Sequence, residues 1–124
     1  DVVDCSAGGI KGAPAFRATD DGAPLRGDRP PGFQVPYADR VRKDAGVKTM
    51  AVGVITEAHQ AEAILQEGRA DLVALGREIM YNPFWPLHAA QLLGADPECA
   101  MWPRQYGWAV RRRAEIAAQN VRSV

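Results

Sequence analysis

Apolar residues along the chain follow two patterns, short continuous runs and stripes at helical spacing. The continuous runs predict three strands, at Asp1 to Ser6, Lys48 to Val52 and Leu72 to Leu75. Each of these runs passes directly into a segment that contains glycine. Glycine at the end of a buried strand lets a ligand approach backbone N–H groups, so the three strand ends are candidate binding positions.

Helical stripes lie between the predicted strands. The first predicted helix runs from Val35 to Ala45, with Pro36 in its first turn and Gly46 as its stop. The second begins after Thr56, which we expect to be its N-cap, and it ends at Gly68. Strands and helices therefore alternate, which predicts an α/β fold with parallel strands and right-handed crossovers.

Three further helices are expected after the third strand. Gly76 opens a short helix that Asn82-Pro83 interrupts, and the next helix spans Phe84 to Leu93. The last helix begins at Pro103. Its apolar stripe recurs every three or four residues, at Tyr106, Val110, Ala114, Ala117 and Val121. The basic run Arg111-Arg112-Arg113 of this helix is expected to face solvent.

The predicted sheet is too small to be a complete barrel. Three parallel strands leave two edges and one face poorly covered. The chain also begins with Asp1 rather than Met and opens directly in a strand. We therefore expect the chain to be a fragment, whose missing partner is the amino-terminal part of the same protein. Gly8 to Gly32, rich in glycine and proline, is expected to be a long loop at the ligand-facing end.

Composition and charge narrow the range of functions. The chain has 47% hydrophobic residues, and its 15 basic residues balance its 15 acidic ones, so no electrostatic case for nucleic acid or a membrane surface arises. No apolar run is long enough for a membrane span or a signal peptide. Cys5 and Cys99 form no metal-binding spacing with His59 or His88, which we expect to be structural or surface residues. Unpaired cysteines indicate a reducing, cytoplasmic setting.

Residues at the strand ends also have ordinary structural interpretations. Gly53 alone is explained by a tight turn between a strand and a helix. Arg77 alone is explained as a solvated or ion-paired arginine near a helix start. Ser6 either faces a ligand or bonds nearby main chain. Cys5 is interpreted as a small core residue, because nothing nearby in the sequence favours a thiolate.

Four segments carry a resemblance to a known family: Asp4-Cys5-Ser6-Ala7-Gly8-Gly9, Pro31-Gly32-Phe33-Gln34-Val35-Pro36-Tyr37-Ala38, Ala51-Val52-Gly53-Val54-Ile55-Thr56, and Ala70-Asp71-Leu72-Val73-Ala74-Leu75-Gly76-Arg77-Glu78 with Asn82-Pro83. In this order they resemble the closing third of an old yellow enzyme, an FMN-dependent NAD(P)H oxidoreductase. Their spacing is similar to that of the thermophilic-like or bacterial NADPH dehydrogenase subgroup. The resemblance implies about strands six to eight of a TIM (β/α)8 barrel in residues 1–101, followed by a C-terminal segment and helix in residues 102–124.

The resemblance places the FMN phosphate at Gly53, Gly76 and Arg77. In such barrels, phosphate sites are often built by the loops after strands seven and eight and by the start of a short helix. The N–H groups after Gly76 would point at an anion, and the Arg77 guanidinium would add charge-assisted hydrogen bonds. Ser6 is a further candidate contact with the cofactor.

The resemblance also implies an ene-reductase reaction. NAD(P)H would reduce the flavin, which passes hydride to an alkene activated by a carbonyl or nitro group. The histidine or His/Asn pair and the tyrosine of the family lie upstream of the first residue of this sequence. No catalytic residue is therefore assigned to this chain, and the isolated chain is expected to be inactive.

The segment from Trp102 to Trp108 resembles the C-terminal segment that, in this subgroup, lines the substrate pocket of a neighbouring subunit. It implies a homo-oligomer in which Trp108 contributes to that pocket. Some members carry an arginine where this chain has Trp108, so the chemistry of the contact differs. The alternative is that Tyr106 and Trp108 pack the last helix against the barrel.

Two other functions remain open on the sequence. One is a non-catalytic fragment or split-barrel partner, and the other is a different phosphate-binding TIM barrel, acting on a nucleotide or sugar phosphate. Asn82-Pro83 and the segment from Pro103 to Trp108 argue against the second. The sequence selects neither a particular alkene nor NADH over NADPH, and it assigns no ligand to Lys11 to Arg29, which resembles an insertion.

Overall fold

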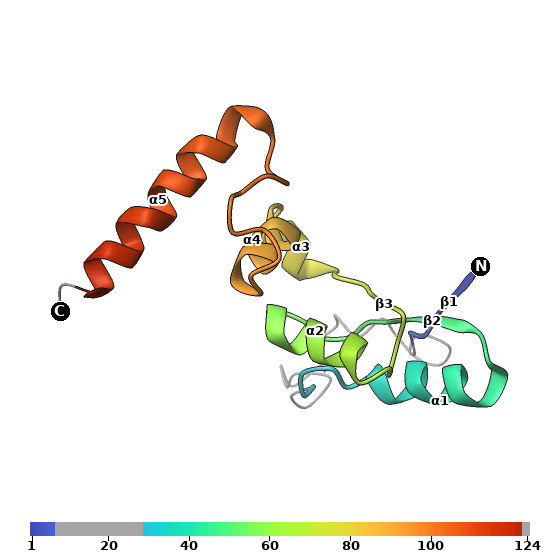
Figure 1. The fold of residues 1–124 in the computed structure, drawn as a ribbon. Helices are drawn as coiled ribbons and strands as arrows, with labels where there is room; N and C mark the ends of the chain where they lie inside the picture. Colours follow the sequence, from blue (N-terminus) through green and yellow to red (C-terminus); the bar gives the residue numbers. More distant parts are fainter. Residues whose placement is uncertain (7–28, 123–124) are drawn as a thin grey trace, which may run out of the picture. The chain divides into compact units, whose positions relative to one another are not determined.

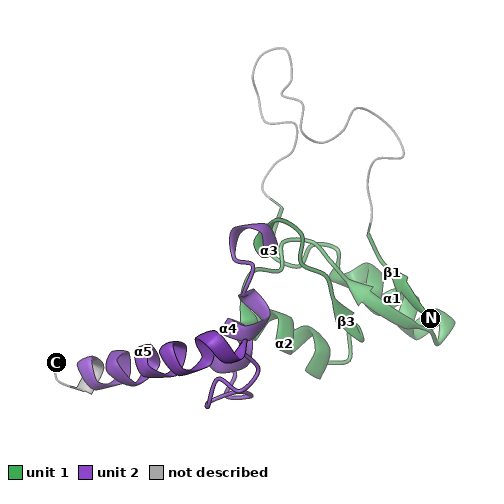
Figure 2. Ribbon diagram, turned by 90° about the horizontal axis from the view of Figure 1, so that it is seen from above, with its two compact units in different colours: residues 1–78 green, residues 79–124 purple. Residues whose placement is uncertain are grey.

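The structure is a computed structural model that describes residues 1–6 and 29–122. The chain divides into two compact units, residues 1–78 and 79–124, which are drawn in different colours in Figure 2. Most of the predicted loop from Gly8 to Gly32 lies outside the described residues, as do Gly8 and Gly9 of the first family segment. The expected division after residue 101 refers to a complete barrel and stays a prediction.

The first unit contains a parallel sheet of three strands, labelled in Figure 1: β1 (Val2–Asp4), β2 (Lys48–Ala51) and β3 (Leu72–Val73). The strand order follows the sequence, with β2 in the middle. The register aligns Asp4 with Met50, and Met50 with Leu72. This arrangement confirms the predicted α/β class with parallel strands. β3 is shorter than predicted because β2 ends at Ala51, whose carbonyl oxygen accepts a last bond from the Ala74 N–H at 2.8 Å.

Two helices lie on the same face of this sheet, α1 (Val35–Ala45) and α2 (Ala58–Gln66) (Figure 1). The bounds of α1 are as predicted. Gly46 ends it in the left-handed conformation, with φ of 62° and its N–H donating to the Arg42 carbonyl oxygen. The apolar stripe of α2 buries three residues: Ala58, Ala61 and Ile64.

Thr56 is not the N-cap of α2, so this prediction is wrong. The N-cap position belongs to Glu57, whose side chain makes no capping hydrogen bond. The side chain of Gln60, in the first turn, reaches back instead, and its Oε1 accepts the Thr56 N–H at 3.1 Å. The Gln60 side chain thus bonds the N–H of the residue before the N-cap, much as the glutamine of a capping box bonds the N–H of the cap itself.

The two faces of the sheet have different surroundings. Alternate strand residues point to opposite faces, so Thr49 and Ala51 share the face toward the helices, and both are fully buried. Met50 and Leu72 share the other face, where 49% of Leu72 is exposed. Within the described residues of the first unit, helices therefore cover only one face of the sheet.

An ion pair joins α1 to the sheet near the amino ends of β2 and β3. Arg42 Nε lies 3.1 Å from Asp71 Oδ2, and Arg42 Nη1 donates to the Gly68 carbonyl oxygen at 3.0 Å. The same carboxylate oxygen of Asp71 accepts the Thr49 N–H at 2.9 Å. These bonds fix α1 and the segment before β3 against the middle strand.

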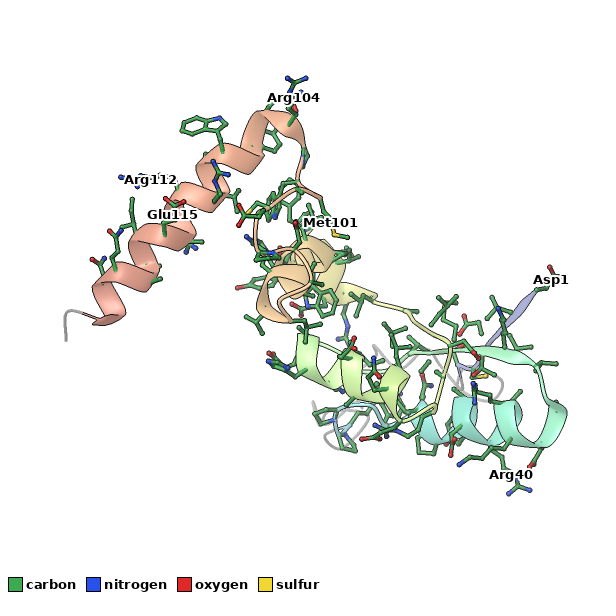
Figure 3. The ribbon with its side chains drawn as sticks, viewed as in Figure 1. Asp1, Arg40, Met101, Arg104, Arg112 and Glu115 are labelled. Atoms are coloured by element: carbon green, nitrogen blue, oxygen red, sulfur yellow. The ribbon has the colours of Figure 1, made fainter. Side chains whose placement is uncertain are left out.

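The second unit contains the helices α4 (Trp85–Leu92) and α5 (Arg104–Arg122), while the short α3 (Arg77–Tyr81) crosses the boundary between the units. The segment between α4 and α5 is organised by the buried Asp96, whose carboxylate accepts the N–H groups of Ala100 and Met101 at 2.7 and 3.0 Å. Figure 3 labels Met101 in this segment.

α5 is largely exposed within its own unit. The three arginines of the predicted basic run are all exposed, which confirms that they face solvent: Arg111, Arg112 and Arg113. Arg112, labelled with Glu115 in Figure 3, pairs with that carboxylate at 3.2 Å one turn further along the helix. Among the helices of the described residues, none is long and apolar enough to cross a bilayer.

Candidate functional site

The carboxyl ends of the three strands meet at one edge of the sheet. The register pairs Asp4 with Met50 and Ala51 with Val73, so the strands end almost level with one another. Beyond β1, the Cys5 N–H still donates to the Met50 carbonyl oxygen at 3.1 Å. The segments that follow β1, β2 and β3 therefore all begin at this edge, and they contain the candidates that the sequence singled out: Ser6, Gly53, Gly76 and Arg77.

Gly53 lies in a turn whose conformation and packing both require glycine. Its φ is 112°, a value that residues with a side chain rarely adopt. A Cβ atom at Gly53 would also lie 2.9 Å from Cε1 of Phe33. The turn therefore explains this glycine without a ligand, and the cofactor contact of Gly53 stays a prediction.

Val54, the next residue, also has a positive φ, of 52°. A β-branched residue in this conformation is a genuine outlier, with an energetic cost on the order of 1–3 kcal/mol. Such conformations persist only where the surroundings hold them, and they concentrate at functional sites. The turn after β2 is thus a strained segment at the carboxyl edge of the sheet.

Gly76 differs from Gly53, because nothing among the described residues requires it to be glycine. A Cβ atom there would meet no described atom within 4 Å. Its φ is outside the positive range in which glycine is favoured. The missing side chain leaves open space beside the backbone, as expected where a ligand approaches the chain.

Arg77 is the first residue of α3 and is exposed. It forms no ion pair with any carboxylate of residues 1–6 and 29–122. Of the two ordinary interpretations, an ion-paired arginine is therefore not supported within the described residues, whereas a solvated arginine agrees with its exposure. A guanidinium without a carboxylate partner suits a phosphate, which it can bind through two parallel hydrogen bonds.

The residues at this edge fit the phosphate group of FMN. A phosphate needs N–H donors, a positive charge and room for its oxygens. The edge offers backbone N–H groups after Gly53 and Gly76, the guanidinium of Arg77, and the open space at Gly76. The described part of the chain contains no group of three His, Cys, Asp or Glu residues that could hold a metal ion.

Ser6 and Cys5 follow β1 but have different surroundings. Ser6 is exposed at the carboxyl edge, and its contact with a cofactor stays a prediction. Cys5 is 7% exposed, which confirms it as a core residue. Burial raises the pKa of the Cys5 thiol, and the neighbouring Asp4 carboxylate acts in the same direction. The thiol therefore stays protonated near neutral pH and is a poor nucleophile.

The sequence did not predict the roles that three residues play around the Gly53 turn. The Gly32 N–H donates to the carbonyl oxygens of both Gly53 and Val54, at 2.9 and 3.1 Å. Phe33 packs against Gly53, and the side chain of Gln60 donates to Val54. The only available signal was a glutamine in the first turn of a helix that follows a glycine turn, and many structural glutamines share that pattern.

The aromatic residues of the second unit divide into a buried and an exposed group. Trp102 is 8% exposed, and its ring centroid lies 5.3 Å from that of Phe84 and 5.2 Å from that of His88. Tyr106 contacts Phe84 edge-on, with ring centroids 6.4 Å apart. Trp108, by contrast, is 69% exposed. Tyr106 is 51% exposed despite this contact, and whether either residue packs the last helix against the barrel stays a prediction.

The two histidines are both exposed on helices, as expected. His59 lies on α2 in the first unit, and His88 lies on α4 in the second. His88 Nδ1 is within hydrogen-bond distance of the Asn82 side chain, at 3.0 Å from its Nδ2. His59 lies on the helix that covers the sheet and not in a segment that follows a strand.

Comparison with known proteins gives this edge a family context. A sequence profile of the NADH:flavin oxidoreductase / NADH oxidase family matches residues 27–95, more than half of the chain. The chain is 46% identical over 110 residues to an NADPH dehydrogenase of Geobacillus thermodenitrificans. This alignment covers 87% of the chain and 28% of the relative. It is 50% identical over 80 residues to an NADPH dehydrogenase of a further Geobacillus strain, covering 63% of this chain and 23% of the relative.

A third relative is an NADPH dehydrogenase of Halalkalibacterium halodurans, 45% identical over 94 residues, which are 76% of this chain and 24% of the relative. The chain thus spans about a quarter of the length of these curated relatives. The profile match includes both glycines and the arginine of the carboxyl edge. These matches confirm the resemblance to the old yellow enzyme family, and the chain belongs to the NADH:flavin oxidoreductase / NADH oxidase family.

Proposed function

We propose that the protein containing this chain is an FMN-dependent NAD(P)H oxidoreductase, and that residues 1–101 form about strands six to eight of its TIM barrel. Family membership supports the flavin oxidoreductase. The sequential strand order supports the barrel, since both helices lie on one face and the other face is left for a barrel interior.

The chain would supply part of the FMN phosphate site. The observation that carries this assignment is the open backbone at Gly76 beside Arg77, at the same sheet edge as the Gly53 turn; Arg77 is exposed and has no carboxylate partner among residues 1–6 and 29–122. Gly53 and Gly76 would present backbone N–H groups, Arg77 would neutralise the charge, and Ser6 would make a further contact. When bound, FMN supplies the hydride-transfer chemistry between NAD(P)H and substrate, while these residues hold and orient it.

The substrate class we propose is a small alkene activated by a carbonyl or nitro group, which makes the enzyme an ene-reductase. Support for it comes from the resemblance of the four sequence segments. No residue of this chain is assigned to the chemical step, and the chain alone would be inactive as a reductase. Purified residues 1–124 that reduce an enone with NADPH would contradict this part of the proposal.

The exposed Trp108 supports a second element of the proposal, a homo-oligomer in which this residue reaches the substrate pocket of a neighbouring subunit. A tryptophan that is 69% exposed suits a contact between subunits, because aromatic residues are enriched at protein interfaces. The cytoplasm is the proposed location, since Cys5 and Cys99 are both free thiols.

Purification of the full-length protein tests the proposal. We expect a yellow protein, and the flavin that denaturation releases from it should be FMN. Without oxygen, NAD(P)H should bleach the yellow colour by reducing the flavin. An enone such as cyclohexenone should then restore the colour by reoxidising it. A colourless protein that binds a sugar phosphate would favour another phosphate-binding barrel. A colourless protein without affinity for either ligand would favour the non-catalytic alternative.

A further inference from the structure

Arg29 lies over the aromatic ring of Phe33, beside the turn that follows β2. The central carbon of its guanidinium is 4.7 Å from the centroid of this ring. The same ring packs on the backbone of Gly53, where a Cβ atom would lie 2.9 Å from Phe33 Cε1. One half-buried ring therefore holds the Arg29 cation next to the Gly53 turn, at the carboxyl edge of the sheet.

The backbone between Arg29 and Phe33 fixes this contact. The Phe33 N–H donates to the Pro30 carbonyl oxygen at 3.1 Å, which closes a tight turn directly after Arg29. The Gly32 N–H joins this turn to the Gly53 carbonyl oxygen at 2.9 Å. The position of Arg29 at the carboxyl edge is therefore set by main-chain bonds as well as by the ring.

Arg29 and Arg77 differ from the other described arginines of the first unit. Within residues 1–6 and 29–78, three arginines pair with a carboxylate: Arg40, Arg42 and Arg69. Neither Arg29 nor Arg77 has a carboxylate partner among these residues. Stacking uses only the face of the Arg29 guanidinium, and its N–H groups point outward in the plane of the group. The two arginines that lack a carboxylate partner thus both lie at the carboxyl edge.

Two guanidinium groups at one edge suit a phosphate monoester. Such a group carries about −1.5 to −2 charges at pH 7, so a single arginine neutralises only part of it. A planar guanidinium binds phosphate oxygens through two parallel hydrogen bonds, and it loses less hydration than an ammonium group on doing so. FMN carries a phosphate monoester, and NADPH carries one at its 2′ position, whereas riboflavin and NADH lack these groups.

We propose that Arg29, stacked on Phe33, is a second phosphate-binding cation at the carboxyl edge, and that it binds a phosphate monoester of the flavin or of the reducing coenzyme. This inference rests on the proposed function. It adds to Arg77 a residue to which the sequence alone assigns no ligand. Phe33 acts as a positioning residue, because it holds the guanidinium and does not touch the phosphate.

The first arm of the test compares FMN with riboflavin. Dissociation constants for both are measured by flavin fluorescence quenching on the full-length apoprotein. Arg29→Met removes the charge and keeps an unbranched side chain that can still pack on Phe33. If the flavin is the source of the phosphate, Arg29→Met should weaken FMN binding about tenfold and leave riboflavin binding unchanged.

The second arm compares NADPH with NADH on the full-length protein saturated with FMN. The measured quantity is the ratio of kcat/KM for NADPH to kcat/KM for NADH. If the coenzyme is the source of the phosphate, Arg29→Met should lower this ratio about tenfold and leave both flavin dissociation constants unchanged.

Arg40→Met is the matched control, because Arg40 is an exposed arginine of the same unit that pairs with Asp44 on α1. It should change neither comparison. If Arg29→Met fails to fold, Arg29→Lys provides the same test. Lysine keeps the charge but lacks the planar group that binds phosphate through two parallel bonds, so the loss should be smaller and in the same direction.

The outcomes separate this inference from the proposed function. A selective loss in either arm supports Arg29 as a phosphate-binding residue and identifies the source of the phosphate. Unchanged values in both arms, or equal losses for ligands with and without the phosphate, would overturn the role of Arg29. A wild-type preference for FMN over riboflavin would still keep the proposed function in that case. A wild-type protein that binds neither flavin would overturn both.

Discussion

The backbone N–H of Thr49 donates to the Oδ2 atom of Asp71 at 2.9 Å, so a carboxylate just before β3 replaces a backbone acceptor for the middle strand. Thr49 is fully buried, and the same oxygen accepts a bond from Arg42 Nε at 3.1 Å. One carboxylate therefore joins α1, β2 and the segment before β3, at the amino ends of the strands.

This arrangement makes the stability of the fold sensitive to acid. The Thr49 N–H, and after it the Arg42 side chain, hold the pKa of Asp71 below its ordinary value of 3.8. A lowered pKa means that the native state favours the carboxylate, so the contribution is present above pH 3.8 and is lost as the pH falls through the lowered pKa.

Asp71→Ala should therefore lower the melting temperature near neutral pH, and the difference between the mutant and wild-type melting temperatures should narrow as the pH falls below 3.8. The measurement is thermal unfolding of the full-length protein across this pH range. Asp44→Ala is the control, because Asp44 pairs with Arg40 on the surface of α1. Equal effects of the two substitutions at neutral pH would contradict a special role for Asp71.

Gly53→Ala should destabilise the fold more than the same change at another glycine with positive φ. The Cβ atom would meet Phe33 at 2.9 Å in addition to the unfavourable φ of 112°, and we expect a loss of about 2–4 kcal/mol. Gly46→Ala carries the φ penalty alone, with φ of 62° and open space, and should lose about 1 kcal/mol. Chemical denaturation measures both, and a Gly46→Ala loss as large as that of Gly53→Ala would refute the role of Phe33.

Gly76→Ala should behave in the opposite way. The Cβ atom meets no described atom and φ is unstrained, so the free energy of unfolding should change by less than about 0.5 kcal/mol. If the open space receives phosphate, FMN binding should weaken about tenfold, equivalent to ~1.4 kcal/mol. Denaturation of the apoprotein and flavin titration measure the two effects. Unchanged FMN affinity would remove Gly76 from the site.

Much of the fold was predictable because its determinants are local in the sequence. Gly46 ends α1 where predicted, since a left-handed glycine is a strong local stop. The cap of α2 was not predictable, because the choice between Thr56 and the Gln60 side chain depends on the Gly53–Val54 turn between strand and helix. The length of β3 likewise depends on where its partner strand ends.

The candidate site was predictable only in part. Gly53 and Gly76 could be placed at one edge because parallel strands end together. The different reasons for the two glycines depend on φ and on Phe33, which no local pattern reveals. The hydrogen bonds from the Gly32 N–H to the turn connect residues that are distant in sequence, so a single sequence carries no signal for them.

The two tryptophans of the second unit should respond differently to substitution. Trp102→Ala removes a buried ring that contacts Phe84 and His88, and should cost about 3–5 kcal/mol of stability. Trp108→Ala removes an exposed side chain and should leave subunit stability nearly unchanged. If Trp108 reaches a neighbouring subunit, the Trp108→Ala substitution should instead weaken the oligomer or raise KM for the alkene. Sedimentation and steady-state kinetics that match the wild type would reject that contact.

The most direct test of the phosphate site is the affinity of the full-length protein for FMN and riboflavin, with and without Arg77→Ala. Loss of a charge-assisted bond to phosphate should weaken FMN binding about 10- to 100-fold and leave riboflavin binding unchanged. That result would place the phosphate at the carboxyl edge beside Gly76. An Arg77→Ala protein that keeps the wild-type preference for FMN over riboflavin would show that the phosphate binds elsewhere.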